Sequence, residues 1–202
     1  MLIPFILEKA VSLHADREAV VCGKHRFTYR DFARRVHGLS GFLHAQGVGK
    51  GDCVAILHQN SHEFLEAYFA VAGIGAILNP LNTRLSPREL SSILDDSEAG
   101  TLLAASRFTD KVAALAELGS RIQRVIWTGE GQRSSPFQSF DYEEVLSRGS
   151  APPAPPEMED DHVAQLYYTS GTTGVPKGVM LSHRNVCVHA LATIAELQIT
   201  DR

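Results

Sequence analysis

The sequence predicts an α/β fold in which a mostly parallel sheet is flanked by helices. Two observations support this fold class: short apolar runs alternate with segments of helical periodicity, and capping residues or glycines separate them. The chain has 202 residues and 44% hydrophobic composition. A chain of this length buries about 70% of its extended surface on folding. We therefore expect a packed core between sheet and helices.

Two short strands and a helix are expected first. The strands cover 19–22 and 26–28, on either side of a glycine turn. Thr28 and Asp31 have the spacing of a capping box at the start of a helix. Apolar residues at helical spacing continue this helix, and Gly47 is placed to end it.

Strands and helices alternate after this point. A helix is expected over 61–72, with Asn60 and Glu63 at its cap, and Ser86 and Glu89 form the capping box of the next helix. The alternation implies a parallel sheet covered by helices, because parallel neighbours need crossover connections. The other expected elements are strands over 53–57, 76–80, 101–105 and 124–127 and helices over 86–95 and 108–118.

A segment rich in proline and acidic residues divides the chain. We expect 149–161 (GSAPPAPPEMEDD) to connect an α/β sub-domain at 1–148 to a further sub-domain that begins in 162–202. The last part is expected to contain a strand, a glycine-rich loop, a returning strand and a helix capped by Ser182. The two strands are placed at 163–169 and 178–181, and the apolar face of the helix comprises Val186, Ala190, Ile194 and Leu197.

Charge and cysteine content exclude several classes of function. The net charge is −4 and no segment concentrates Lys and Arg, so we expect no nucleic-acid partner. The three cysteines lack paired spacing, which favours a reducing, cytoplasmic compartment. The amino terminus lacks a signal-peptide pattern, and the longest apolar run, 67–78, is shorter than the roughly 20 residues that span a bilayer. We expect a soluble protein, for which peripheral membrane contact and homo-oligomer formation stay open.

The most informative segment is the run YYTSGTTGVPKGVMLSHRN at 167–185. Its glycines let the backbone approach a ligand closely, and its hydroxyls can reach phosphate oxygens or a cation. Lys177 supplies the countercharge between Pro176 and Gly178, an order that excludes a Walker A loop. The pattern predicts a polyphosphate-binding loop, and the alternative is a flexible Gly/Thr surface hairpin. The residues expected to contact the phosphates are Thr169, Ser170, Gly171, Thr172, Thr173, Gly174 and Lys177.

The residues TSGTTGVPKG resemble the phosphate-binding signature of the adenylate-forming superfamily. This superfamily comprises acyl-CoA and aryl-CoA synthetases, luciferases and the adenylation domains of peptide synthetases. A second segment, NSHEFLEAYFAVAGIGAILNPLNTRLSPREL at 60–90, is similar to the part of acyl-CoA synthetases that precedes this loop. The resemblance covers nearly the whole chain, but only the amino-terminal part of the large domain of these enzymes.

Two residues of the loop receive specific roles. Lys177 is the candidate catalytic residue, because an ammonium beside the β- and γ-phosphates of ATP neutralises charge on departing pyrophosphate. Thr169 is the candidate ligand of Mg²⁺, which prefers hard oxygen ligands and bridges protein to phosphate. His183 and Arg184 either add positive potential near the anion or face solvent in the first turn of the helix. Elsewhere the sequence offers no convincing catalytic triad or metal-ligand spacing.

The resemblance implies a reaction that uses ATP, Mg²⁺ and, as co-substrate, coenzyme A. It implies that the chain is the amino-terminal portion of an AMP-forming acyl-CoA synthetase, which lacks full turnover alone and acts, when complete, on a small carboxylic acid. The asparagine, threonine and arginine of the turn within 79–86 resemble those of fatty-acyl and medium-chain acyl-CoA ligases, and this resemblance favours a fatty acid. Two alternatives stay open: a member that activates an aryl or amino acid, and a truncated, non-catalytic nucleotide-binding or interaction module.

Overall fold

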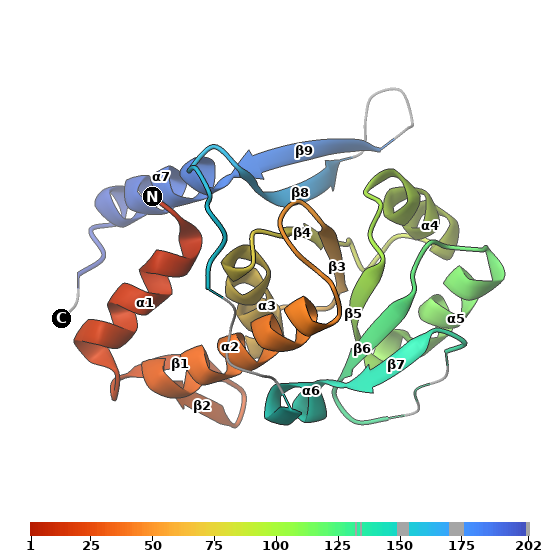
Figure 1. The fold of residues 1–202 in the computed structure, drawn as a ribbon, viewed down its shortest axis with the longest axis horizontal. Helices are drawn as coiled ribbons and strands as arrows, with labels where there is room; N and C mark the ends of the chain where they lie inside the picture. The colour runs from red at the N-terminus through yellow and green to blue at the C-terminus, as the bar shows by residue number, and fades with distance from the viewer. Residues whose placement is uncertain (132, 134, 149–153, 170–175, 201–202) are drawn as a thin grey trace.

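The computed structural model describes residues 1–131, 133, 135–148, 154–169 and 176–200. These residues form a seven-stranded sheet and a separate two-stranded hairpin (Figure 1). The order in the sheet is β7-β6-β5-β3-β4-β8-β9, and every neighbouring pair is parallel except β8 and β9. Its strands are β3 (Cys53–Leu57), β4 (Ile77–Pro80), β5 (Thr101–Ala105), β6 (Arg124–Thr128), β7 (Gln138–Asp141), β8 (Val163–Thr169) and β9 (Lys177–Ser182).

Helices cover both faces of the sheet (Figure 1). The described helices are α1 (Ile3–His14), α2 (Tyr29–Ala45), α3 (His62–Gly73), α4 (Pro87–Asp96), α5 (Thr109–Glu117), α6 (Tyr142–Arg148) and α7 (His183–Glu196), with a 3₁₀ turn, η1 (Ser106–Phe108), before α5. The separate hairpin consists of β1 (Glu18–Cys22) and β2 (His25–Thr28). None of the helices in the described ranges is both long enough and apolar enough to cross a membrane.

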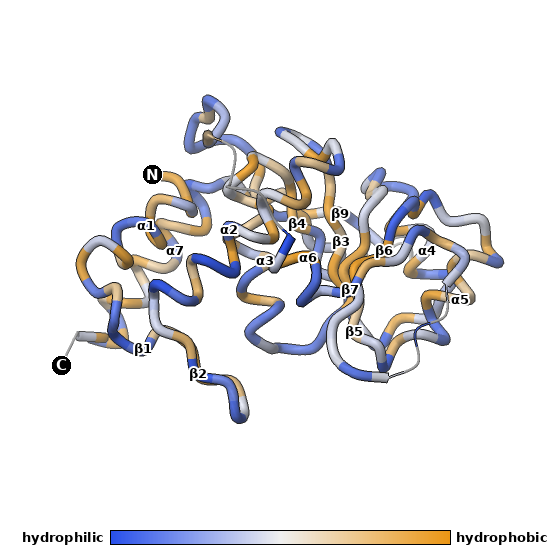
Figure 2. The backbone as a smooth tube through the Cα atoms, turned by 60° about the horizontal axis from the view of Figure 1, so that its bottom comes forward, coloured by the Kyte–Doolittle hydropathy of each residue, from blue (hydrophilic) through white to orange (hydrophobic). Residues whose placement is uncertain are grey.

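The same central strands supply two cores. Successive side chains of a strand point to opposite faces. Ile56 and Leu103 therefore pack with residues of α2 and α3, whereas Leu57 and Leu102 pack with residues of α4 and α5. Because both faces are covered, these strands are hydrophobic along their length, as the orange segments in the centre of Figure 2 show.

The predicted parallel sheet with flanking helices is confirmed. Strands β3, β5 and β8 have the expected bounds, and the capping box of α4 forms between Ser86 and Glu89. The predicted cap of α3 is wrong by one residue. Ser61 rather than Asn60 has the extended backbone of an N-cap, and its hydroxyl accepts a hydrogen bond from the Phe64 backbone N–H.

Four described elements were not predicted: α1, η1, β7 and α6. The apolar face assigned to the last helix is packed only at its amino-terminal end, where Val186 contacts the core. His183 and Cys187 are the buried residues of α7, whereas the side chains of Ile194 and Leu197 are 45% and 65% exposed. The amino-terminal turns of α7 pack against Ile3 of α1 and Ala72 of α3, so tertiary neighbours rather than apolar periodicity select the buried face.

Strands β8 and β9 lie beyond β4 in the same sheet as the strands that precede 149–161. The structure describes this connection from residue 154 onward, where Lys50 Nζ donates a hydrogen bond to the Glu157 carbonyl at 2.8 Å. The division into sub-domains stays a prediction. What the topology establishes is that the carboxyl ends of β3, β4 and β8 lie at one edge.

A buried carboxylate joins three helices on one face of the sheet. Glu66 of α3 is fully buried and accepts hydrogen bonds from Arg35 Nε of α2 and from the Tyr142 hydroxyl of α6, both at 2.6 Å. Burial raises the pKa of Glu66, and the Arg35 guanidinium opposes that rise. Arg35 also pairs with Glu143 at 2.7 Å, where the Glu143 side chain is 64% exposed.

Replacing Glu66 by alanine should lower the free energy of unfolding by about 3–5 kcal/mol, because Arg35 and Tyr142 lose a buried charged partner. The matched change Glu143→Ala removes the exposed partner of the same arginine and should cost at most about 1 kcal/mol. Urea denaturation of both variants measures the difference. Equal losses would show that the buried carboxylate has no special role.

Candidate functional site

An open cavity of about 460 Å³ lies at the carboxyl ends of β3, β4 and β8. His58 follows β3, and Asn82 and Thr83 follow β4. Tyr167 and Tyr168 lie near the end of β8, and all five residues line this cavity. In parallel α/β sheets ligands bind at this edge, because the loops that follow the strands converge there. The cavity therefore lies where the fold most readily accepts a ligand.

His58 lines this cavity and is held by hydrogen bonds at both ring nitrogens. Its Nδ1 lies 2.6 Å from the Gln59 carbonyl and its Nε2 lies 2.7 Å from Thr128 Oγ1. With Nδ1–H donated to the carbonyl, Nε2 accepts from the threonine hydroxyl. The ring is thus a satisfied, buried bridge between the ends of β3 and β6.

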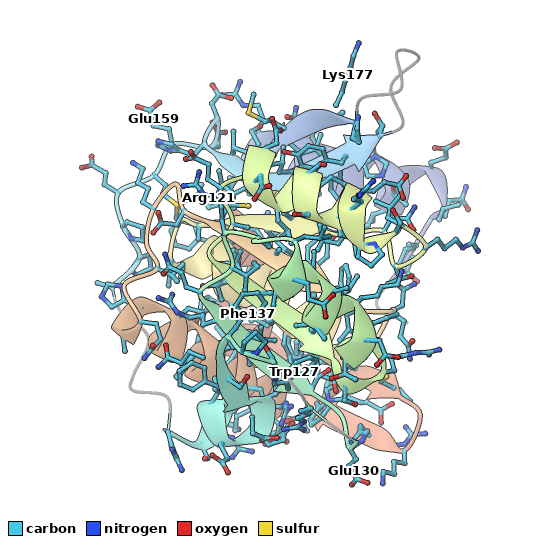
Figure 3. All side chains as sticks on the ribbon, turned by 90° about the vertical axis from the view of Figure 1, so that its right-hand side faces the viewer. Arg121, Trp127, Glu130, Phe137, Glu159 and Lys177 are labelled. Carbon is cyan, nitrogen blue, oxygen red and sulfur yellow. The ribbon has the colours of Figure 1, made fainter. Side chains whose placement is uncertain are left out.

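The β8–β9 hairpin presents the two ends of the predicted phosphate loop. In its antiparallel register Thr169 pairs with Lys177, and both residues are exposed. Figure 3 shows the Lys177 side chain pointing away from the body of the protein at the top of the fold. The other predicted phosphate contacts, Ser170, Gly171, Thr172, Thr173 and Gly174, lie outside the described residues. The structure thus places the proposed cation opposite the proposed Mg²⁺ ligand.

The last two tyrosines of β8 make contacts that sequence reasoning missed. The Tyr167 hydroxyl hydrogen bonds the Tyr68 hydroxyl of α3, and the Tyr168 hydroxyl donates to the Asp96 carboxylate at the end of α4. These partners lie 99 and 72 residues away along the chain. The only available signal was the pair of aromatic residues directly before the loop, and a strand propensity explains such a pair equally well.

His183 fits neither of the two expected roles, whereas Arg184 faces solvent in the first turn of α7, which is one of them. His183 is fully buried, and its Nδ1 accepts a hydrogen bond from the Ile3 backbone N–H at 3.2 Å. Burial lowers the pKa of His183, so its ring is neutral and adds no positive potential. Arg184 is exposed and pairs with Asp160 at 2.8 Å. Both residues therefore dock the start of α7, one on α1 and the other on the segment before β8.

The described residues contain no group of three or more His, Cys, Asp or Glu side chains placed to hold a metal ion. The predicted role of Thr169 in Mg²⁺ binding is untested by this observation. A metal that keeps several waters and is held largely by substrate phosphates needs few protein ligands, and the exposed Thr169 hydroxyl beside the loop fits such a site.

Comparison with known proteins identifies the family. The sequence profile of the family described as AMP-binding enzyme matches residues 7–202. The chain belongs to the AMP-binding enzyme family. The TSGTTGVPKG segment, which carried the resemblance to adenylate-forming enzymes, lies within the matched region. The expected membership is therefore confirmed.

Curated relatives of this AMP-binding chain include ligases of different acids. It is 40% identical over 190 residues to a long-chain-fatty-acid–CoA ligase of Thermus thermophilus, covering 92% of this chain and 34% of the relative. It is 33% identical over 201 residues to 4-hydroxybutyrate–CoA ligase 2 of Metallosphaera sedula, covering 96% and 36%. A feruloyl-CoA synthase of Amycolatopsis is 40% identical over 191 residues, covering 95% and 35%. The chain spans about a third of the length of these relatives.

Solved structures show the same fold. The o-succinylbenzoate CoA synthetase of Bacillus subtilis, in complex with an acyl-adenylate intermediate, has a TM-score of 0.75 and 30% identity, covering 96% of this chain and 46% of that one. A fatty acyl CoA synthetase of Mycobacterium tuberculosis has a TM-score of 0.78 and 26% identity, covering 95% and 37%. The parallel sheet and its helices are thus those of the amino-terminal part of this family.

Acidification should destabilise the AMP-binding chain partly through His183. Burial, and then the positive charges of His162 and the amino terminus, lower its pKa in the folded state, so the unfolded chain binds the proton more tightly. The contribution of His183 is present above the ordinary histidine pKa and is lost as the pH falls below it. In His183→Asn, whose side-chain oxygen can still accept from Ile3, the free energy of unfolding should fall less steeply between about pH 7 and about pH 5.

Urea denaturation at a series of pH values measures this slope. The wild-type protein and His183→Asn are compared at each pH, so contributions from other histidines cancel in the difference. Identical slopes would contradict a buried, neutral His183.

Proposed function

We propose that this chain is the amino-terminal portion of an AMP-forming acyl-CoA synthetase. In the first reaction a carboxylate oxygen attacks the α-phosphorus of ATP, which forms an acyl-adenylate and releases pyrophosphate. In the second, the deprotonated thiol of coenzyme A attacks the acyl carbon, forms the thioester and releases AMP. Family membership and the placement of Lys177 opposite Thr169 support this proposal.

The observation that carries the proposal is the position of Lys177. It is an exposed cation at one end of a loop rich in glycine and hydroxyl side chains, and among the described residues no carboxylate pairs with it. A free ammonium beside a polyphosphate offsets the negative charge that accumulates on departing pyrophosphate. Thr169, across the hairpin, would help to hold Mg²⁺, whose role is to neutralise and orient the phosphates.

A fatty acid is the substrate that we favour. The turn that carries Asn82, Thr83 and Arg84 resembles that of fatty-acyl ligases, and Asn82 and Thr83 line the cavity beside β8. An aryl acid is a second candidate, because the feruloyl-CoA synthase of Amycolatopsis is as similar in sequence as the fatty-acid ligase of Thermus thermophilus. A non-catalytic nucleotide-binding module is the remaining alternative, since the chain spans about a third of these relatives.

Titration of MgATP into the 202-residue chain by calorimetry tests the role of the loop. We expect saturable binding that Lys177→Ala weakens at least tenfold, or about 1.4 kcal/mol, through loss of the countercharge. Lys24→Ala removes an equally exposed lysine from the β1–β2 turn and should leave the affinity unchanged. Lack of binding by the wild-type chain, or equal affinities for all three proteins, would contradict the proposed phosphate site.

Acid-dependent exchange of labelled pyrophosphate into ATP identifies the substrate class in the complete protein. A fatty acid should stimulate the exchange more than an aryl or amino acid, because only the true substrate forms the adenylate and makes the first step reversible. Stronger stimulation by ferulate or benzoate would replace the fatty acid by the aryl candidate. No stimulation by any acid would favour the non-catalytic module.

A further inference from the structure

The two tyrosines near the end of β8 point to opposite faces of the sheet. Tyr167 and Tyr168 are consecutive, and both are half-buried. Tyr167 lies on the face covered by α3, and Tyr168 lies on the face covered by α4, as their hydroxyl partners show. The strand end is therefore held from both sides directly before Thr169.

These tyrosine contacts matter because the ladder that joins β8 to β4 is short. The ladder between β4 and β8 is a single residue pair, Leu78 with Gln165, and β4 ends at Pro80, which has no backbone N–H to donate. On the other side, β9 is the edge strand of the sheet. Residues 166–169 thus lie beyond the paired residue of the β4–β8 ladder, and their partners in the register are residues of β9.

On the α3 side, Tyr167 contacts a rigid part of the core. Its hydroxyl hydrogen bonds the Tyr68 hydroxyl, and Tyr68 is preceded by the fully buried Ala67 on the same helix. The Tyr68 ring also lies 5.5 Å from that of Phe64, measured between centroids. Two packed rings and a buried helix therefore fix the point to which Tyr167 is attached.

On the α4 side, Tyr168 contacts β9, the strand that begins with Lys177. Tyr168 pairs with Gly178, and a Cβ added at Gly178 would lie 3.4 Å from Tyr168 Cζ and 3.0 Å from Leu166 Cδ1. The tyrosine ring thus occupies the space beside the residue that follows Lys177. Its hydroxyl donates to Asp96, so α4, the ring and Gly178 form one continuous contact.

We propose that Tyr168 with Asp96, and Tyr167 with Tyr68, are positioning residues that fix both ends of the phosphate-binding loop before ATP arrives. We call these four residues the tyrosine clamp. This inference rests on the proposed function and deepens it. Lys177 contacts phosphate, whereas the tyrosine clamp fixes the positions of Lys177 and Thr169. Holding these ends in the ligand-free protein reduces the ordering that binding must otherwise bring about.

Removal of one clamp hydroxyl should weaken MgATP binding without a matching loss of stability. Calorimetry on the 202-residue chain should give about three- to tenfold weaker binding for Tyr168→Phe and for Tyr167→Phe, the range expected for one hydrogen bond. Asp96→Asn keeps an oxygen that can accept from Tyr168 and should bind like the wild type, whereas Asp96→Ala should bind like Tyr168→Phe.

Tyr142→Phe is the matched control. It removes a phenolic hydroxyl that donates to the buried Glu66 of α3, two residues from Tyr68, so it perturbs the same helix and leaves both clamp hydroxyls in place. It should lower the denaturation midpoint and leave the affinity for MgATP unchanged. Wild-type affinity in Tyr168→Phe and Tyr167→Phe, or an equal loss of affinity in Tyr142→Phe, would overturn the clamp.

Failure of the proposed function gives a different result. If the wild-type chain binds no MgATP, the phosphate site is refuted. Amide hydrogen exchange in the ligand-free protein then tests whether the tyrosine clamp holds the hairpin. Faster exchange of the amides of 177–180 in Tyr168→Phe than in Tyr142→Phe would retain the clamp as the support of the hairpin. Equal exchange in the two variants would overturn it.

Discussion

The parallel pairing of β8 with β4 is the constraint on which the arrangement of the site depends. It adds β8 to a sheet built from the preceding strands, and it directs the end of β8 to the same edge as the ends of β3 and β4. The ladder with β4 is one residue pair long, and the last residues of β8 before the loop pair with β9. The cavity and the two ends of the loop therefore share one edge of the sheet.

Stability and the proposed ligand recognition depend on different polar groups in this protein. The Glu66 carboxylate joins α2, α3 and α6 inside the core, where burial makes each of its hydrogen bonds costly to lose. The groups beside the loop, Lys177 and Thr169, are exposed and contribute little to packing. The two tyrosines of β8 are intermediate in burial between these two groups. Their hydroxyls hydrogen bond residues of α3 and α4 at the loop end of the hairpin.

The relatives explain why the loop is the most specific signal in the sequence. They are named for a fatty acid, a hydroxy acid and an aromatic acid, yet the chain resembles each along more than nine-tenths of its own length. Polyphosphate binding makes the same demand whatever the acid: close backbone approach, hydroxyl donors and a cation. This part of the protein therefore reports the nucleotide chemistry more clearly than the identity of the acid.

The sequence by itself determined the parallel α/β class, the bounds of β3, β5 and β8, the cap of α4 and the family, because apolar periodicity, capping residues and the glycine-rich loop are local patterns. Only the tertiary structure decided that His183 is buried, that Ser61 caps α3 and that Tyr167 and Tyr168 are held by Tyr68 and Asp96. Those outcomes depend on neighbours brought together by folding or on a backbone angle at one residue, and neither is encoded by spacing along the chain.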